Sequence, residues 1–246
     1  MKTIQKLTLG LLTVVAFSTS TSAANLIMDV EGTDVATNSG VLTGTGQKIG
    51  AGTLIMSGAN GSSLTNLEIA GGLVQYAASG NVGAQVTFNG GNLESTAAAN
   101  IPALVMTAAG TVTAGGDGAL AGLSGASKLT IAGTGIVTPA DLSGAGAAVD
   151  ISGKVNFGAS SASKLPAADI NVLSGGLAKV MAATADCAPD DMIVQSGGVL
   201  EVADSVSVPA SGAGDLFGTL KFNTGSTLKL GNSTVWARAI TVGVAL

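Results

Sequence analysis

The chain has 246 residues, of which 37 are glycine, 46% are hydrophobic, 10% are charged and 3% are aromatic. Beyond an apolar stretch near the start, no run approaches the roughly 18 residues that a membrane-spanning helix needs. The regular spacing of Val, Ile and Leu excludes a chain that is disordered by composition. Abundant Gly, Ala, Ser, Thr and Asn are instead typical of many short strands joined by tight turns.

Residues 1–24 have the layout of a secretory signal peptide. Lys2 and Lys6 form a basic start, an apolar run extends from Leu7 to Phe17, and small residues up to Ala24 offer a cleavage site. A membrane anchor is the alternative, but the apolar run is short for one. We therefore expect an exported protein, at the cell surface or in the extracellular medium, with the periplasm also open.

The expected mature chain, residues 25–246, is acidic. Without Lys2 and Lys6 it keeps eight of the 10 basic side chains against 15 acidic ones. This excess of negative charge disfavours nucleic acid and anionic lipid as partners. The mature chain also contains no candidate membrane span.

A degenerate repeat runs along the mature chain, and the stretch from Ile49 to Leu73 is its best copy. In each copy a glycine follows an apolar-x-apolar element, and successive marker glycines recur at intervals of 19 to 27 residues, a period that indicates a solenoid. The markers are Gly52, Gly72, Gly91, Gly110, Gly133, Gly153, Gly176, Gly198 and Gly225.

Charged residues within the repeats indicate strands rather than helices. Glu68, Asp150, Glu201, Lys221 and Lys229 each stand between two apolar residues. In a strand, neighbouring side chains point to opposite faces, so each charge faces water while its neighbours face a core. We expect the same alternation to turn the side chains of residues 73 and 202 inward.

These patterns predict an all-β, single-domain, right-handed parallel β-helix (β-solenoid) of roughly nine coils with capped ends. The acidic segment 25–38 is the expected N-terminal cap, and 234–246 is an expected last strand or edge. The alternative is an antiparallel sandwich, whose hairpins would favour Asn-Gly turns. Only Asn60-Gly61 and Asn89-Gly90 fit that pattern.

Residues 50–73 resemble the passenger-associated β-strand repeat of bacterial autotransporters. The matching positions are Gly50, Gly52, Thr53, Leu54, Ser57, Gly58, Ala59, Asn60, Gly71, Gly72 and Leu73. The resemblance implies an outer-surface passenger of a Gram-negative bacterium, most often an adhesin or a surface scaffold. Its expected partner is a host or matrix protein or a glycan surface. Because the chain lacks a segment that resembles the C-terminal β-barrel of that family, we expect a stand-alone solenoid or part of a longer passenger.

We predict no catalytic, cofactor-binding or metal-binding residues. The chain has no histidine, which excludes sites that need imidazole. Asp190 and Asp191 are adjacent and are the one candidate for a catalytic pair, but acids are common in turns. Cys187 lies among acids that raise a thiol pKa and is expected to be a turn residue.

Two further motifs have structural interpretations that we favour. Residues 115–118 match half of a calcium-binding nonapeptide, but with the aspartate at the wrong position and no second copy. Tyr76 and Trp236 would stack on a sugar ring only if they were exposed.

The sequence thus predicts a secreted structural or adhesive β-solenoid that is not an enzyme. Two alternatives remain open. One is a carbohydrate-active β-helix enzyme. The other is a self-assembling subunit, of the surface-layer type, that associates through its coil ends.

Overall fold

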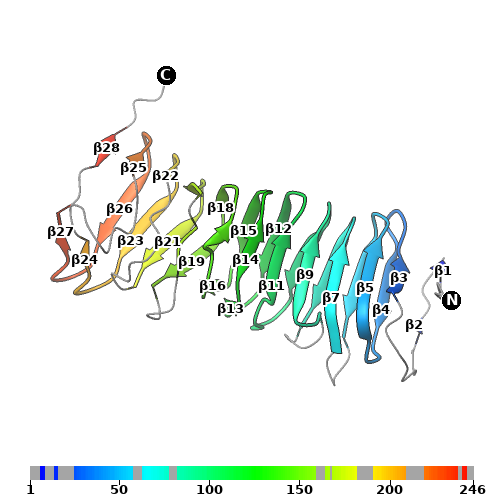
Figure 1. Cartoon of the computed structure of the whole chain (residues 1–246). Helices are drawn as coiled ribbons and strands as arrows, with labels where there is room; N and C mark the ends of the chain where they lie inside the picture. Colours follow the sequence, from blue (N-terminus) through cyan, green and yellow to red (C-terminus); the bar gives the residue numbers. More distant parts are fainter. Residues whose placement is uncertain are drawn as a thin grey trace.

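The computed structural model describes residues 6–8, 14–15, 25–57, 63–77, 82–158, 164–166, 168–181, 191–208, 219–237 and 240–242. These residues form strands and turns stacked into a rod, with the two ends of the chain at opposite ends of the rod (Figure 1). Every paired strand runs parallel to its partner. The predicted all-β parallel β-solenoid of about nine turns is therefore confirmed. Within the described residues, no helix is long and apolar enough to cross a membrane.

Three long sheets form the sides of the rod. Sheet A contains β1 (Lys6–Thr8), β3 (Asn25–Asp29), β5 (Thr43–Ile49), β7 (Ser63–Ile69), β9 (Gln85–Phe88), β11 (Ala103–Met106), β14 (Leu123–Gly125) and β17 (Gly144–Ala145). Sheet B contains β2 (Val14–Val15), β4 (Val35–Asn38), β6 (Thr53–Met56), β8 (Leu73–Tyr76), β10 (Asn92–Ser95), β12 (Gly110–Ala114), β15 (Leu129–Gly133), β18 (Val149–Ile151), β20 (Ile170–Val172), β22 (Asp191–Val194), β25 (Thr219–Phe222) and β28 (Thr241–Val242). Sheet C contains β13 (Gly118–Leu120), β16 (Ile136–Pro139), β19 (Lys154–Phe157), β21 (Leu177–Val180), β23 (Val199–Val202) and β26 (Thr227–Leu230). A short terminal sheet pairs β24 (Ser207–Val208) with β27 (Val235–Trp236).

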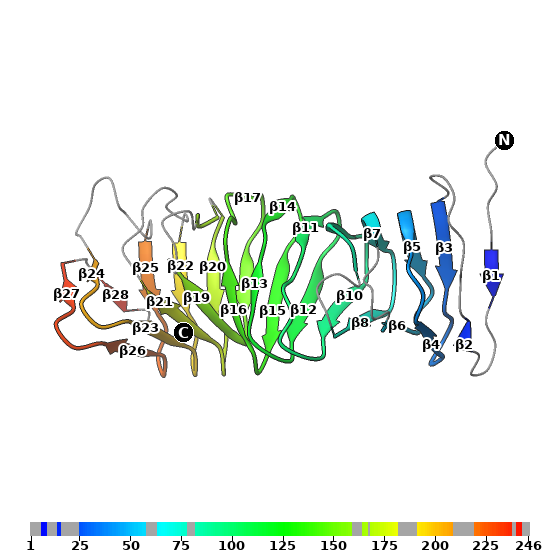
Figure 2. The ribbon, with the colours of Figure 1, turned by 90° about the horizontal axis from the view of Figure 1, so that it is seen from below.

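Sheet B alone runs through the whole rod (Figure 2). The first coils combine strands of sheets A and B, and the last coils combine strands of sheets B and C. Strands of all three sheets occur together only in the middle, around β11 to β19. The cross-section of the rod therefore changes along its axis, although the strand-by-strand stacking continues.

The core is built from axial columns of inward side chains. On sheet B one column takes one residue from each strand from β4 to β28. Its members from Leu54 to Phe222 are all at most 7% exposed. Burial of each such aliphatic side chain contributes about 1.5–3 kcal/mol. The column is Ala36, Leu54, Val74, Leu93, Val112, Ile131, Ile151, Val172, Val194, Phe222 and Val242.

The alternation of inward and outward residues is as expected at most of the charged positions. Glu68, Glu201 and Lys221 lie on the outer face and are half-buried, while their apolar neighbours are fully buried. The inward position of Val202 is also confirmed. The prediction for Leu73 is wrong: Leu73 is half-buried on the outer face, because the strand register stacks Val74, and not Leu73, on the buried Leu54 and Leu93.

Lys48 is a buried cation that the sequence pattern does not reveal. Its side chain is 0% exposed. The Nζ atom donates to the carbonyl oxygens of Gly50 (2.5 Å), Gly52 (2.7 Å) and Gly71 (2.9 Å). Burial lowers the pKa of Lys48, and the negative charge of Asp29 opposes that change. Lys48 thus joins carbonyl groups of two successive turns between sheets A and B.

The two terminal segments contribute strands to the rod. The acidic segment 25–38 supplies β3 and β4, with Glu31 exposed in the turn between them. The segment 234–246 supplies β27 and β28. A last strand was one of the two expectations for this segment. Residues of the expected signal peptide supply β1 and β2, which pair with β3 and β4.

Candidate functional site

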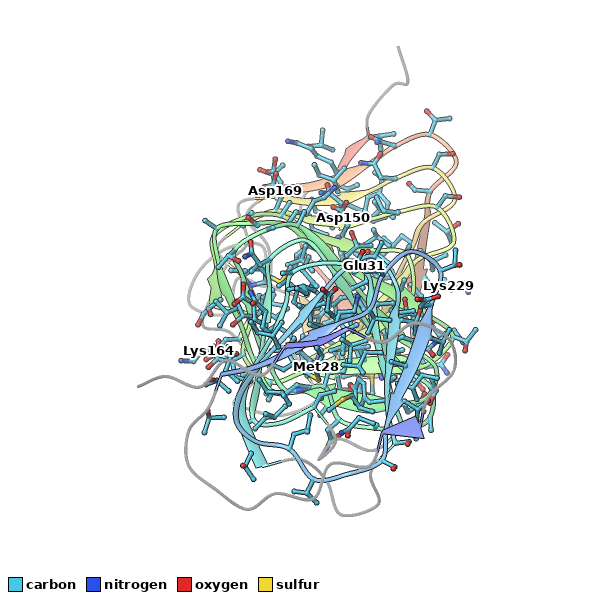
Figure 3. All side chains as sticks on the ribbon, turned by 90° about the vertical axis from the view of Figure 1, so that its right-hand side faces the viewer. Met28, Glu31, Asp150, Lys164, Asp169 and Lys229 are labelled. Atoms are coloured by element: carbon cyan, nitrogen blue, oxygen red, sulfur yellow. The ribbon has the colours of Figure 1, made fainter. Side chains whose placement is uncertain are left out.

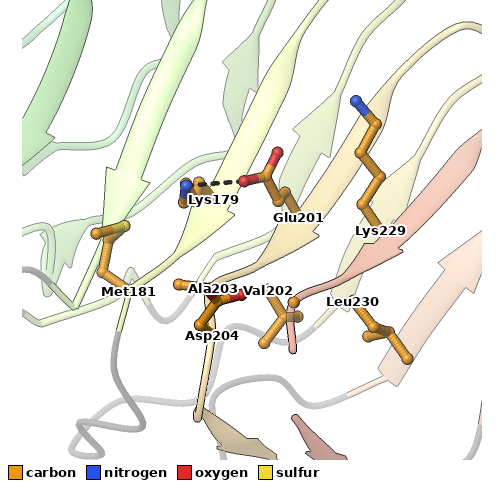
Figure 4. A pocket seen from close by; sticks show the side chains of 9 residues that line it. Lys179, Met181, Glu201, Val202, Ala203, Asp204, Lys229 and Leu230 are labelled. Carbon is orange, nitrogen blue, oxygen red and sulfur yellow. Dashed lines mark ion pairs between the residues drawn. The ribbon is translucent and has the colours of Figure 1, made fainter. Parts of the chain in front are cut away.

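A shallow groove of about 670 Å³ lies on sheet C (Figure 4). It lies near the C-terminal end of the rod, where β21, β23 and β26 and the turns that follow them are side by side. Its lining residues are Lys179, Met181, Glu201, Val202, Ala203, Asp204, Lys229, Leu230 and Gly231.

Strand register brings three charged residues of the groove into one row. Lys179 pairs in register with Glu201, and Glu201 with Lys229, so the row alternates in sign. Lys179 Nζ and Glu201 Oε1 are 2.8 Å apart. Lys229 is exposed, and among the described residues it has no ion-pair partner within 4.0 Å. The row therefore ends on an ammonium group that faces water.

The floor of the groove is a tight turn that fixes Asp204. Asp204 Oδ1 accepts a hydrogen bond from the backbone N–H of Asn232 at 2.7 Å. The backbone N–H of Ser205 donates to the carbonyl oxygen of Asn232 at 2.8 Å. A Cβ atom at Gly231 would lie 2.5 Å from Asp204 Oδ1, so only glycine fits at this position. The Asp204 carboxylate is therefore held by one backbone N–H of the next coil.

Two apolar side chains form the borders of the groove. Met181 is 38% exposed and Leu230 is 50% exposed. Exposed large apolar side chains are uncommon on the sides of this rod, so the presence of Met181 and Leu230 in the lining distinguishes the groove from the other faces. The arrangement suits a ligand that has an anionic group and an apolar or sugar-ring face.

The groove is hard to find from sequence because its charges are far apart in the chain. Lys179, Glu201 and Lys229 each lie a full coil away from the next. The signal that identifies them is the alignment of three short segments, LAKV (177–180), VLEV (199–202) and TLKL (227–230), in which the charge occupies the third position. Unequal spacing hides this alignment until the strand register is known.

Elsewhere on the outer surface, charged groups pair between coils. Lys128 Nζ lies 2.8 Å from Asp150 Oδ2, and Asn171 Nδ2 donates to Asp150 Oδ1 at 2.9 Å. Asp150, which was expected to face water, is only 7% exposed between these partners. Lys221 forms an ion pair with Asp191, and the hydrogen bond from Lys221 lowers the pKa of the Asp191 carboxyl group. The two charges of each pair neutralise one another within the sheet, so these pairs do not leave an open site.

The structure places several of the sequence candidates in structural roles. Asp191 begins β22 and bonds Lys221, whereas Asp190 and Cys187 lie outside the described residues. Asp117 accepts the backbone N–H of Ile136 at 2.9 Å, as a bond between coils. Within the described residues, no three His, Cys, Asp or Glu side chains gather as a metal site would require.

The two aromatic candidates also have structural positions. Tyr76 is 1% exposed, and its hydroxyl group donates to the carbonyl oxygen of Asn100 at 3.3 Å. Burial raises the pKa of Tyr76. Trp236 is half-buried against the core. Tyr76 therefore cannot stack on a sugar ring.

Comparisons of the chain with protein-family models, with curated proteins and with solved structures returned no match.

Proposed function

We propose that the protein is an exported structural or adhesive β-solenoid of the autotransporter-passenger type. The groove on sheet C is its principal contact surface. The observation that carries this proposal is the row of Lys179, Glu201 and Lys229, which ends on an ammonium group without an ion-pair partner among the described residues. The signal-like layout of residues 1–24 and the repeat at 50–73 support export and the passenger type.

The partner that suits this surface is a glycan or glycoprotein that carries carboxylate or sulfate groups. Lys229 supplies the charge that such a group recognises, and the borders formed by Met181 and Leu230 supply apolar contact. One exposed ammonium group contributes little affinity in water. Adhesion therefore depends on many copies acting at one surface, through avidity.

Binding is favoured over catalysis because both carboxylates of the groove already have partners. Glu201 forms an ion pair with Lys179, and Asp204 accepts a backbone N–H. A general acid or base needs a carboxyl group that can reach the substrate and change its protonation state. Both carboxylates of the groove are instead engaged in contacts within the rod.

Bead retention under flow tests the adhesive function. Beads coated with the exported protein are passed over surfaces of an acidic polysaccharide or of neutral dextran. We expect retention on the acidic surface only, reduced several-fold by Lys229→Ala and by salt of about 0.5 M, which screens exposed charges. Lys154→Ala is the matched control, because Lys154 is an exposed lysine of sheet C in the middle of the rod. Equal retention of the Lys229→Ala beads would contradict the proposed surface.

A carbohydrate-active enzyme is the second candidate, because the groove combines carboxylates with ammonium groups. Incubation with acidic polysaccharides, followed by measurement of new reducing or unsaturated ends, tests it. We expect no turnover. Turnover that Glu201→Gln abolishes and Lys154→Ala leaves intact would make catalysis the function of the groove.

Export is tested separately by mass spectrometry of protein recovered outside the producing cell. We expect an N-terminus at Ala24 or Asn25, as the small residues before these positions indicate. Retention of residues 1–24 would contradict the export proposal without affecting the groove.

A further inference from the structure

Exposed apolar side chains concentrate at the two ends of the rod. Among the described residues, seven large apolar side chains are exposed. Four of them, Leu230, Val235, Ile240 and Val242, belong to the last coil, and Val35 and Val41 belong to the first. The sides of the rod contribute only Met181. An apolar patch of this kind, bordered by polar residues, indicates an interaction surface.

The C-terminal end interrupts core columns that are fully buried elsewhere. Val242 continues the sheet B column from Phe222 and is 73% exposed, because no described residue stacks on it. Leu230 similarly continues a sheet C column from Val202 and is 50% exposed. Both side chains point where the next coil of a solenoid would bury them.

The N-terminal end has a strand edge that accepts parallel partners. In the full chain, β1 pairs with β3 and β2 pairs with β4, in each case in parallel. The removal of residues 1–24 is part of the proposed function, and the inference rests on it. Once these residues are removed, the backbone N–H and C=O groups of β3 and β4 lose those partners. Such an edge is a template for another strand. Ala36 heads the sheet B column on this edge.

The two ends carry opposite charge. Residues 25–47 contain Asp29, Glu31 and Asp34 and no basic residue. Residues 219–246 contain three basic residues and no acidic one; of these, Lys221 is paired with Asp191 of the preceding coil, and Lys229 is exposed without an ion-pair partner among the described residues. Figure 3 looks onto the N-terminal end, where Glu31 lies in the exposed turn of the first coil. Opposite charges on two surfaces favour their encounter and fix which surface meets which.

We propose that the mature protein associates end to end, with the last coil of one copy seated on the first coil of the next. Sheet B provides the continuity because it alone reaches both ends, so β28 of one copy lies next to β4 of the following copy. Val242 then stacks on Ala36, and the acidic turn faces the basic last coil. The contact joins two different surfaces, so it does not close on itself and builds a linear filament.

Sedimentation velocity of the exported protein tests this proposal. At about 0.05 M salt we expect the mean sedimentation coefficient to rise with concentration, and at about 0.5 M salt we expect this rise to be much smaller. Val242→Asp should abolish association, and Lys229→Glu should weaken it about tenfold. Lys154→Glu, the matched charge reversal in the middle of the rod, should have no effect. The circular dichroism spectrum of each variant checks that it is folded.

Mixing two inactive variants distinguishes end-to-end association from other contacts. One variant carries Val242→Asp at the C-terminal end, and the other carries Glu31→Lys with Asp34→Lys at the N-terminal end. Each should be monomeric alone, and the mixture should form dimers with one copy of each variant and nothing larger. Only a contact between two different ends gives this result.

Two results would overturn the proposal. The first is a protein that begins at Ala24 or Asn25 and stays monomeric at every concentration at low salt. This result leaves export and adhesion untouched. The second is association that Val242→Asp does not change. A failure of bead retention, in turn, would contradict the adhesive groove but not the end contact.

Discussion

The N-terminal and C-terminal halves of the rod use the same short motif at different corners of the coil. In the N-terminal half, Ile69-Ala70-Gly71-Gly72-Leu73 joins a strand of sheet A to a strand of sheet B. In the C-terminal half, the similar segment 170–177 joins a strand of sheet B to a strand of sheet C. The motif therefore specifies a strand, a tight corner and a second strand, and not a place in the coil.

The change occurs between Gly110 and Gly133. Gly110 begins a strand of sheet B, and Gly133 ends the next strand of that sheet. In the strand register, Gly110 pairs with Leu129, at the start of that next strand, and not with Gly133. The interval between the two glycines therefore exceeds one coil by the length of a strand. This longer interval marks the point where sheet C replaces sheet A.

The two corners also differ in how closely they are packed. The corner at Gly72 surrounds the Lys48 ammonium group, whereas the corner at Gly175 is a hydrogen-bonded turn open to solvent. In the latter, the Gly176 N–H donates to the Leu173 carbonyl oxygen at 2.9 Å, and the Gly175 N–H donates to Gly197 of the next coil at 3.0 Å. The corner at Gly72 thus depends on a buried charge, and the corner at Gly175 depends on stacked turns.

The largest expected effect is common to both halves. Val74→Asp and Val202→Asp each bury a charge in a core column, and each should lower the free energy of unfolding by more than about 4 kcal/mol. Hydrogen exchange should show lost protection in the neighbouring coils while distant coils stay protected, because each coil contacts only its neighbours. Leu73→Asp is the matched control on the outer face and should cost less than about 1 kcal/mol. Equal damage from Leu73→Asp would mean that the assigned facing of β8 is incorrect.

The next effect separates the halves. Lys48→Met removes the donor for three carbonyl groups and should lower the free energy of unfolding by about 3–5 kcal/mol, with faster hydrogen exchange in β6 and β8. Lys179→Met breaks only the surface pair with Glu201 and should cost at most about 1 kcal/mol. Urea unfolding of the two variants measures the difference. Similar losses in both would show that the Lys48 contacts add nothing to the corner.

Glycine substitutions test the packing of the two corners directly. Gly72 has φ of +64°, and a Cβ there would clash with the Gly52 carbonyl oxygen. Gly72→Ala should therefore cost about 2–4 kcal/mol. Gly175 has φ of +80° with no atom within 4 Å of a Cβ. Gly175→Ala should therefore cost only the about 1–2 kcal/mol of placing an L-residue in the left-handed backbone conformation. A larger loss at Gly175 than at Gly72 in thermal unfolding would reverse the comparison.

The smallest effect is a difference in pH dependence. Lys221 lowers the pKa of Asp191 in the C-terminal half, so the pair stabilises the fold above the unfolded-state pKa, near 3.8. That contribution, below about 1 kcal/mol, is lost as the pH falls through the lowered pKa of the folded state. Lys48 gives a dependence of the same sign in a different pH window: burial lowers its pKa from 10.5, so stability in the N-terminal half rises with pH just below that value.

Melting curves of Asp191→Asn and of the unmodified protein measure the first of these effects. The two melting temperatures should differ at neutral pH and converge as the pH falls through the lowered pKa of Asp191. A difference that persists at low pH would mean that Asp191 acts through its packing and not through its charge.

Much of the fold follows from the sequence because the repeat is local. The recurrence of the glycine motif, the outward position of Glu68 and the inward position of Val202 all follow from short patterns within single coils. The shift of the motif from the corner between sheets A and B to the corner between sheets B and C does not follow from the sequence, since the glycine motif is the same before and after it. Lys48 is also hidden, because β5 is irregular between Gly44 and Thr45 and its register changes there.

The groove depends on information that no single segment contains. Lys179, Glu201 and Lys229 meet only through strand register, and the coil between Val194 and Phe222 is longer than the one before it. A sequence period that varies in this way hides which charges will align. The absence of histidine, in contrast, excludes imidazole chemistry from composition alone.

The hydrogen bonds between coils run along the axis of the rod, and this orientation determines how the molecule responds to tension. A pull on the two termini would peel off the terminal coils first, because the chain leaves the rod there and their hydrogen bonds can open one after another. Each event would release about 20 residues, which extend by roughly 60 Å. The rod would therefore lengthen in steps under shear and dissipate work at each one, as a tether that yields gradually rather than breaking at once.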